Sequence, residues 1–343
     1  MRVLLPLTLT LLTGAAGAAG YPVTVTHTSG QTTLRAEPRR VVALGPHTLD
    51  LLLSLGVQPA GYGEAAQIAT RDYGSPIRQI RYLGSRVTGA PINVGDRFNP
   101  NQEVLLSVKP DLIVGENYAA ANYPALTRLA PTLLLHGIHS GDWQKSIVTL
   151  GRALNREPQA RAVLNRHATF IRRAAQDVPA PLRGARALVV WNSGGPQRDV
   201  FTVLGPRDWT GGFFQSLGFR LALPGSADPA LGEGYRKVSS EALASLDADV
   251  VFLIATSRNT TAQARRDWQA NPLAQRLNAS RSGRVYVLDA QLFSRLRGPI
   301  AEELMVRELQ RQWKPSVISG RSGTRLPAGH LGRYHAVHGH WGD

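Results

Sequence analysis

Two glutamates, Glu103 and Glu241, stand in matching sequence contexts. The stretches Glu103-Val-Leu-Leu-Ser-Val-Lys-Pro-Asp111 and Glu241-Ala-Leu-Ala-Ser-Leu-Asp-Ala-Asp249 share Glu, Leu, Ser and Asp at one offset of 138 residues, and each leads into an apolar run. Equivalent carboxylates in two similar halves suit a two-fold symmetric partner of opposite charge, through electrostatic complementarity. The helix dipole also favours a glutamate at a helix start, so both interpretations stay open.

Side chains for catalysis or metal binding are sparse. The chain has no cysteine, which excludes a thiol nucleophile, a disulfide scaffold and a Cys-ligated metal site. It also lacks a GxSxG elbow, a Walker A motif, a Rossmann glycine fingerprint and HExxH. His335, His338 and His340 could chelate a metal, although a solvated tail explains them as well. We therefore predict no catalytic residues and no metal site.

Apolar runs alternate with helical patterns in the first part of the chain. The predicted strands are Val41–Leu44, Asp111–Val114 and Leu133–Leu135, with a further strand starting at Val57. The predicted helices are Thr48–Leu55, which stops at Gly56, and Asn101–Val108. Strand and helix in alternation favour a parallel sheet covered by helices.

A long helical stretch follows, and then strands resume. Apolar residues recur at helical spacing from Trp143 to Leu154 and from Ala160 to Ala174, with Pro158 in the first turn of the second helix. Later strands are predicted at Ala187–Trp191, Val250–Ile254 and Val285–Leu288. A second echo, Ser54-Leu-Gly56 against Ser216-Leu-Gly218, supports two similar halves.

These patterns predict an α/β protein of two lobes, each with a parallel sheet, bridged by one long helix, with a ligand cleft between the lobes. The predicted boundaries are a signal peptide at 1–20, lobes at 21–142 and 181–313, linker helices at 143–180 and a disordered tail at 314–343.

The N-terminus has the features of a secretory signal. Met1-Arg2 carries one positive charge, an apolar run follows, and small residues fill positions 14–20. We predict cleavage near Ala18–Gly20 and export to the periplasm. Because no cysteine is available for lipid attachment, we expect a protein that is not a lipoprotein.

Charge points to an anionic partner. The chain has 39 Lys and Arg against 24 Asp and Glu, a net charge of +15, and residues 21–313 account for +11 of it. The arginines are scattered without a basic run, so nucleic acid is not the predicted partner. An exported, basic nucleic-acid-binding protein remains an alternative.

The residues also carry a family resemblance. The stretch from Arg40 to Gly56, the motif Val94-Gly-Asp-Arg97-Phe-Asn-Pro-Asn101-Gln-Glu103, and Lys109-Pro-Asp-Leu-Ile-Val-Gly115 resemble periplasmic binding proteins of iron–siderophore and vitamin B12 ABC importers. The likeness runs from Pro38 to Trp313 and is looser in the second half. It implies two Rossmann-like lobes bridged by one helix, and a monomer that is not an enzyme.

The resemblance also implies what the chain does. It would capture a ferric siderophore, with Fe³⁺ held by the siderophore and no cofactor of its own. Glu103 and Glu241 would dock on the two permease subunits of an ABC importer. The positions that match cleft residues are Arg97, Tyr118, Arg207, Trp209, Tyr235, Arg236, Arg258 and Arg295.

Cleft arginines imply an anionic guest, because a buried charge needs a partner. Heme and cobalamin remain alternatives within the same importer class, with Tyr118 or His47 as an axial ligand for heme.

Overall fold

A computed structural model describes residues 20–66, 68, 70–192, 200–225, 234–256 and 259–314. The described residues up to Trp313 form one compact unit, and everything below concerns that unit. The predicted signal peptide, Arg258 and the histidines of the tail lie outside the described residues. The predicted domain boundaries within this unit remain predictions.

The first sheet is entirely parallel, in the order β5-β4-β3-β6-β7. Every residue of the central strand β3 is buried, as expected for a sheet with helices on both faces. The strands are β3 (Val41–Leu44), β4 (Gly61–Glu64), β5 (Ile92–Asp96), β6 (Leu112–Glu116) and β7 (Thr132–Leu135).

Helices flank this sheet, and a hairpin lies beside it. The hairpin, which the sequence did not predict, joins β1 (Val23–His27) to β2 (Gly30–Leu34). The helices are α1 (Pro46–Ser54), α2 (Pro76–Gln79), α3 (Gln102–Val108) and α4 (Tyr123–Leu129), with 3-10 turns η1 (Gly84–Arg86) and η2 (Asn117–Asn122).

One sequence prediction in this part is wrong. Val57 does not start a strand, because its amide donates to the carbonyl of Leu52 at 2.9 Å and so completes the end of α1. Gly56, with φ 77°, turns the chain there in the left-handed region that favours glycine. The strand itself begins four residues later, at Gly61.

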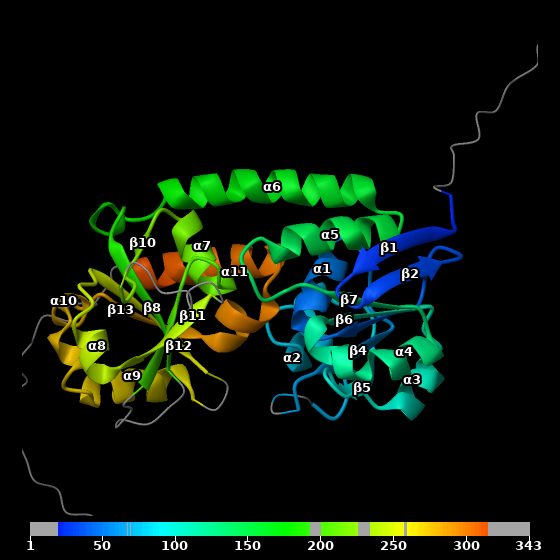
Figure 1. Ribbon diagram of the computed structural model, residues 1–343, viewed down its shortest axis with the longest axis horizontal. Coiled ribbons are helices and arrows are strands. Elements are labelled where there is room, and N and C mark those ends of the chain that lie inside the picture. Colours follow the sequence, from blue (N-terminus) through cyan, green and yellow to red (C-terminus); the bar gives the residue numbers. More distant parts are fainter. Residues whose placement is uncertain are drawn as a thin grey trace, which may run out of the picture. The chain divides into compact units, whose positions relative to one another are not determined.

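Two helices connect the halves. They are α5 (Asp142–Ala153) and α6 (Glu157–Gln176), and a 3-10 turn η3 (Ala180–Leu182) follows. Pro158 lies in the first turn of α6, as predicted. Figure 1 shows α6 running past both sheets, on the side away from α3 and α8.

The second sheet is mixed rather than fully parallel. Its order is β11-β9-β8-β12-β13, with the short β10 also paired to β8. The core strands β8, β12 and β13 are parallel, whereas β9 runs antiparallel to both of its neighbours. The strands are β8 (Arg186–Asn192), β9 (Val200–Leu204), β10 (Arg220–Leu221), β11 (Tyr235–Ser239), β12 (Val250–Ala255) and β13 (Val285–Asp289).

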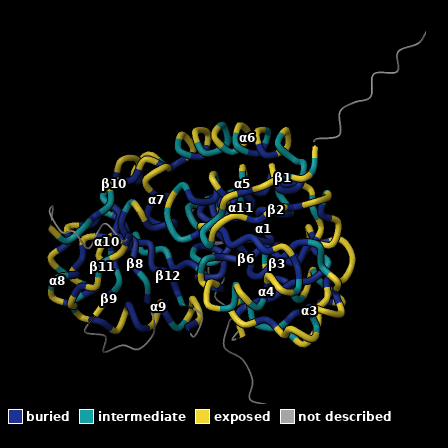
Figure 2. The backbone as a smooth tube through the Cα atoms, turned by 45° about the vertical axis from the view of Figure 1, so that its right-hand side comes forward, coloured by how far each residue is buried: buried dark blue, intermediate teal, exposed yellow. Residues whose placement is uncertain are grey.

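The remaining helices pack around this second sheet. They are α7 (Trp209–Ser216), α8 (Ser240–Ala244), α9 (Thr261–Ala270), η5 (Ala274–Arg276) and α10 (Asn278–Arg281). The chain then forms a short π-turn, η6 (Gln291–Leu296), and a final helix, α11 (Pro299–Trp313). Figure 2 shows the central strands of the two sheets, β3, β6, β8 and β12, as largely buried.

The final helix returns to the first half of the chain. Asp50 of α1 is fully buried and accepts hydrogen bonds from the amides of Ile300 (3.1 Å) and Ala301 (2.7 Å) at the start of α11. One hydrophobic core extends through both halves at this junction. The two sheets are therefore joined by packing as well as by α6.

The internal repeat is visible in the structure. Asp111 precedes β6 and accepts from the amide of Arg40 at 2.8 Å, and Asp249 precedes β12 and accepts from the amide of Arg186 at the same distance. Asn101 and Ser239 cap α3 and α8, accepting from amides at 3.1 and 3.2 Å. The two stretches that share the Glu–Leu–Ser–Asp pattern thus form matching strand–helix–strand units.

Candidate functional site

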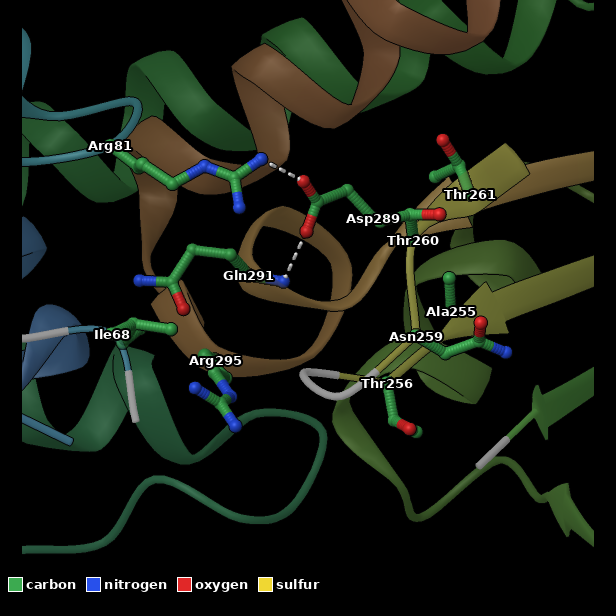
Figure 3. Close-up of a pocket in the computed structure, with 10 residues that line it drawn as sticks. All are labelled: Ile68, Arg81, Ala255, Thr256, Asn259, Thr260, Thr261, Asp289, Gln291 and Arg295. Atoms are coloured by element: carbon green, nitrogen blue, oxygen red, sulfur yellow. Dashed lines mark hydrogen bonds and ion pairs between the residues drawn. The ribbon is translucent and has the colours of Figure 1, made fainter. Parts of the chain in front are cut away.

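A cavity lies at the carboxyl ends of the parallel strands. Ala255 and Asp289, the last residues of β12 and β13, line it, and ligands of open α/β sheets bind at this edge. Its volume is about 260 Å³. The lining residues are Ile68, Arg81, Ala255, Thr256, Asn259, Thr260, Thr261, Asp289, Gln291 and Arg295 (Figure 3).

Polar contacts between the two halves frame this cavity. Asp289 pairs with Arg81 and also accepts from the hydroxyl of Tyr82 at 2.9 Å. Gln291 Nε2 donates to Glu64 Oε2 at 3.2 Å. Burial, followed by the charge of Asp289, raises the pKa of Tyr82, so its hydroxyl stays protonated and remains a donor.

A buried ionic cluster extends the site. Glu116, at the end of β6, lies 2.5 Å from Arg297 Nη2 and 3.6 Å from Arg97 Nη1. Arg297 Nη1 also donates to the carbonyl of Gly137 at 2.6 Å. One carboxylate therefore faces two guanidinium groups.

Backbone conformation explains how Arg297 reaches across from the second half. Its φ of 56° lies in the left-handed region, and Gly298 follows directly. A Cβ on Gly298 would lie 2.3 Å from Asp50 Cγ, so only glycine fits against that buried carboxylate. The turn thus directs Arg297 toward Glu116 while Asp50 holds the start of α11.

Some buried cationic atoms of the cluster lack hydrogen-bond partners. Among the described residues, none accepts a hydrogen bond from Arg97 Nε or Nη1 or from Arg295 Nη1. The ion pair of Arg97 with Glu116, at 3.6 Å, is too long to be a hydrogen bond. Burial, followed by the charge of Arg97, lowers the pKa of Arg295. An anion bound beside these two arginines would satisfy donors that the protein leaves unpaired.

The structure brings some predicted residues together. Arg295 lines the cavity, and its pKa responds to the charge of Arg97. Tyr118 is exposed on η2, and its ring meets Phe98 edge-on at 5.8 Å, while the Arg97 guanidinium lies 4.5 Å from the Phe98 ring centre. These three predicted residues therefore belong to one connected group.

Among the described residues, Arg295 is the only predicted cleft residue in the lining of this cavity, so Arg97 and Tyr118 lie outside it, as do the following four. Trp209 is buried in the hydrophobic core at the start of α7. Arg207 is exposed, and its carbonyl accepts from the amide of Ser140 at 2.9 Å. Tyr235 and Arg236 lie on β11, the edge strand of the second sheet.

Several residues of the site were missed at the sequence level. Arg81, Glu116, Asp289, Gln291 and Arg297 were not among the predicted site residues. Glu116 did have a signal, since it is a charged residue directly after the apolar strand Leu112–Gly115. Arg297 lies within Pro38–Trp313, the part of the chain that resembles the family, but no local pattern connected it to Glu116.

The two repeated glutamates occupy equivalent, exposed positions. Glu103 and Glu241 both lie in the first turn of a helix, two residues after its cap. The helix-start backbone and the Ser239 hydroxyl lower the pKa of Glu241, which keeps it charged. Each half of the protein therefore exposes one of two equivalent glutamates.

The described residues offer neither a membrane span nor a metal site. Among them, no helix is long and apolar enough to cross a membrane. Among the same residues, no group of three His, Cys, Asp or Glu side chains could hold a metal ion. His47, named as a possible heme ligand, is fully buried, with Nε2 3.3 Å from the carbonyl oxygen of His136.

Comparisons with known proteins agree with this architecture. The profile of the periplasmic binding protein family matches residues 41–292. The Fe(3+)-citrate-binding protein YfmC of Bacillus subtilis (strain 168) is 30% identical over 283 residues, covering 82% of this chain and 82% of that protein. The Fe(3+) dicitrate-binding periplasmic protein FecB of Escherichia coli (strain K12) is 27% identical over 289 residues, covering 82% and 87%.

A solved structure has the same fold. The crystal structure of SirA from Staphylococcus aureus, complexed with staphyloferrin B, superimposes with a TM-score of 0.69 at 21% identity, covering 84% of this chain and 98% of that one. At this identity the likeness concerns the fold alone. It confirms the predicted architecture of two α/β lobes bridged by a long helix.

Proposed function

This chain belongs to the periplasmic binding protein family, and on that premise we propose that it is the solute-binding component of an ABC importer and captures an anionic ferric chelate. The chelate would bind beside Arg97 and Arg295, at the carboxyl ends of the strands. Iron would enter already held by the chelate, so it is cargo and not a cofactor. The family binds substrates, and no catalytic step is proposed.

The unpaired guanidinium atoms of Arg97 and Arg295 carry this proposal. Burying a charge without a hydrogen-bonded partner is costly, and the cost is recovered when an anion binds. The planar guanidinium donates two parallel hydrogen bonds to a carboxylate, which suits carboxylate-bearing chelates. The names of YfmC and FecB, which describe ferric citrate and ferric dicitrate binding, point to the same ligand chemistry.

Delivery to the importer would use the two exposed glutamates. Glu103 and Glu241 would pair with basic residues of two permease subunits, one from each half of this protein. Their equivalent positions at the starts of α3 and α8 support this arrangement. The protein would work outside the cytoplasmic membrane as a monomer, released after cleavage near Ala18–Gly20 and without a lipid anchor.

Tryptophan fluorescence tests ligand capture. Trp191, Trp209 and Trp268 report from the second half of the chain. The titrants are ferric citrate, a ferric hydroxamate, a ferric catecholate, heme and cobalamin, each beside its iron-free form or an unloaded control. We expect saturable quenching by an anionic ferric complex. A charged hydrogen bond contributes about 1.5–3 kcal/mol, so Arg97→Ala or Arg295→Ala should weaken binding roughly 10- to 100-fold.

Arg128→Ala is the matched control, because Arg128 is exposed on α4. It should leave the affinity within threefold of the unmodified protein. Saturable binding of only heme or cobalamin would replace the proposed ligand. Equal weakening by all three substitutions would refute the assigned site.

A further inference from the structure

Most of the surplus positive charge lies far from the ligand cavity in sequence. Residues 21–313 hold 34 Lys and Arg against 23 Asp and Glu, a net charge of +11. Residues 142–186, which include α5 and α6, hold nine Lys and Arg against three Asp and Glu, a net charge of +6. The remaining residues of 21–313 hold 25 Lys and Arg against 20 Asp and Glu, so an anionic ligand in the cleft accounts for less than half of the excess.

Four arginines of α6 form the centre of this charge. Arg161, Arg166, Arg172 and Arg173 are all exposed, whereas Ala160, Val163 and Ala174 face the interior. Figure 2 shows this helix with an exposed outer side. We call these four residues the α6 arginine face.

The spacing arranges the face in two rows. Eleven residues separate Arg161 from Arg172, close to three turns, so the two lie on one side, about 16 Å apart along the axis. Seven residues separate Arg166 from Arg173, close to two turns and about 10 Å. Glu157, the one acidic residue in α6, lies at its first position.

The face has no internal counter-charge. Among the described residues, no carboxylate lies within ion-pair distance of these four arginines, and Arg172 donates only to the hydroxyl of Thr169 at 3.0 Å. Beyond the ends of the helix the pattern differs, since Arg156 pairs with Glu37 at 3.4 Å and Arg186 with Asp247 at 3.2 Å. Within each row the arginines lie farther apart than the Debye length of about 8 Å at physiological salt, so their mutual repulsion is weak and each guanidinium can bind an external anion.

We propose that the α6 arginine face binds a linear, phosphate-rich polyanion of the cell envelope. Guanidinium groups bind phosphate oxygens through paired hydrogen bonds, and a row of phosphates matches a row of arginines better than a single small anion does. In Figure 1, α6 lies on the side away from α3 and α8, which carry the docking glutamates. The choice of a polymer over a membrane surface rests on the proposed docking, because a docked molecule would point α6 away from the importer's membrane.

The test uses fluorescence anisotropy of labelled, long-chain inorganic polyphosphate with the full-length protein. The test variant replaces the face with glutamine: Arg161→Gln, Arg166→Gln, Arg172→Gln and Arg173→Gln. The control variant removes the same charge from exposed arginines of the first half: Arg35→Gln, Arg71→Gln, Arg78→Gln and Arg128→Gln. Both are also titrated with ferric citrate, and the unmodified protein is incubated with phosphatidylglycerol and phosphatidylcholine vesicles.

We expect the test variant to lose at least tenfold in polyphosphate affinity and the control variant less than threefold. Four fewer phosphate contacts should flatten the slope of log affinity against log salt by roughly 3. Equal losses in both variants, or vesicle binding without polyphosphate binding, would overturn the proposal. Unchanged ferric citrate binding in both variants separates this result from a failure of the proposed function.

Discussion

The buried carboxyl of Asp50 should make the stability of this protein depend on pH. Asp50 is fully buried and accepts from the amides of Ile300 and Ala301 and from the hydroxyl of Ser54. Burial raises its pKa from 3.8 to about 7, although these hydrogen bonds and the charge of Arg86 act in the opposite direction. The test substitution is Asp50→Asn, which keeps the size of the side chain and removes its ionisation.

The sign follows from the direction of the shift. A group whose pKa is higher in the folded state stabilises that state below its unfolded pKa, near 4, and loses this contribution as the pH rises through about 7. Between pH 8 and pH 5.5 the folded protein should therefore gain about 2 kcal/mol from this one group. The Asp50→Asn protein should lack that gain.

Urea denaturation at pH 5.5, 6.5, 7.5 and 8 gives the free energy of unfolding of both proteins. Subtracting the two values at each pH removes the contributions of groups that titrate alike in both proteins. Asp72→Asn is the control. Hydrogen bonds from Gly74 and Gln79 lower the pKa of Asp72 below 3.8, so this carboxyl stays ionised from pH 5.5 to 8 and its contribution to stability is constant there. A stability difference between wild type and Asp50→Asn that does not vary with pH would refute this reasoning.

Three further outcomes can be measured on single variants. Gly298→Ala should destabilise the protein by about 1–3 kcal/mol in urea, because the new methyl group would overlap Asp50. Asp208→Ala should lower the free energy of unfolding by about 1 kcal/mol, because it removes the acceptor for the amides of Thr210 and Gly211 at the start of α7. An unchanged urea midpoint would contradict this. Charge reversal at Glu103 or Glu241 should abolish stimulation of the importer's ATPase while leaving ferric chelate affinity unchanged, and full stimulation by both variants would exclude docking through these residues.

Local patterns in the sequence were enough to predict much of the fold. The repeated Glu–Leu–Ser–Asp pattern predicted two similar units, and Asp111 and Asp249 make the same backbone contact in both. The long helix was visible from apolar spacing and from Pro158. The antiparallel strands β9 and β11 were missed, because pairing direction depends on contacts that no local pattern encodes.

The candidate site was harder to predict, because its contacts join distant residues. Arg297 and Glu116 are 181 residues apart in the chain, and their contact depends on the left-handed conformation of Arg297 and on Gly298. The sequence offered Arg97 and Arg295 only through a family resemblance. Trp209 shows the limit of that approach, since an aromatic residue at a matching position packs in the core.

Equilibrium dialysis of radioiron-labelled ferric citrate against the purified full-length protein tests the central claim most directly. The account predicts retention that saturates at one ferric complex per chain, that excess iron-free citrate does not abolish, and that Arg97→Ala or Arg295→Ala weakens at least tenfold. Repeating the dialysis with labelled ferric hydroxamate and ferric catecholate completes the measurement. If none of these ferric complexes is retained, or if both arginine variants retain them as well as the unmodified protein does, the account is contradicted.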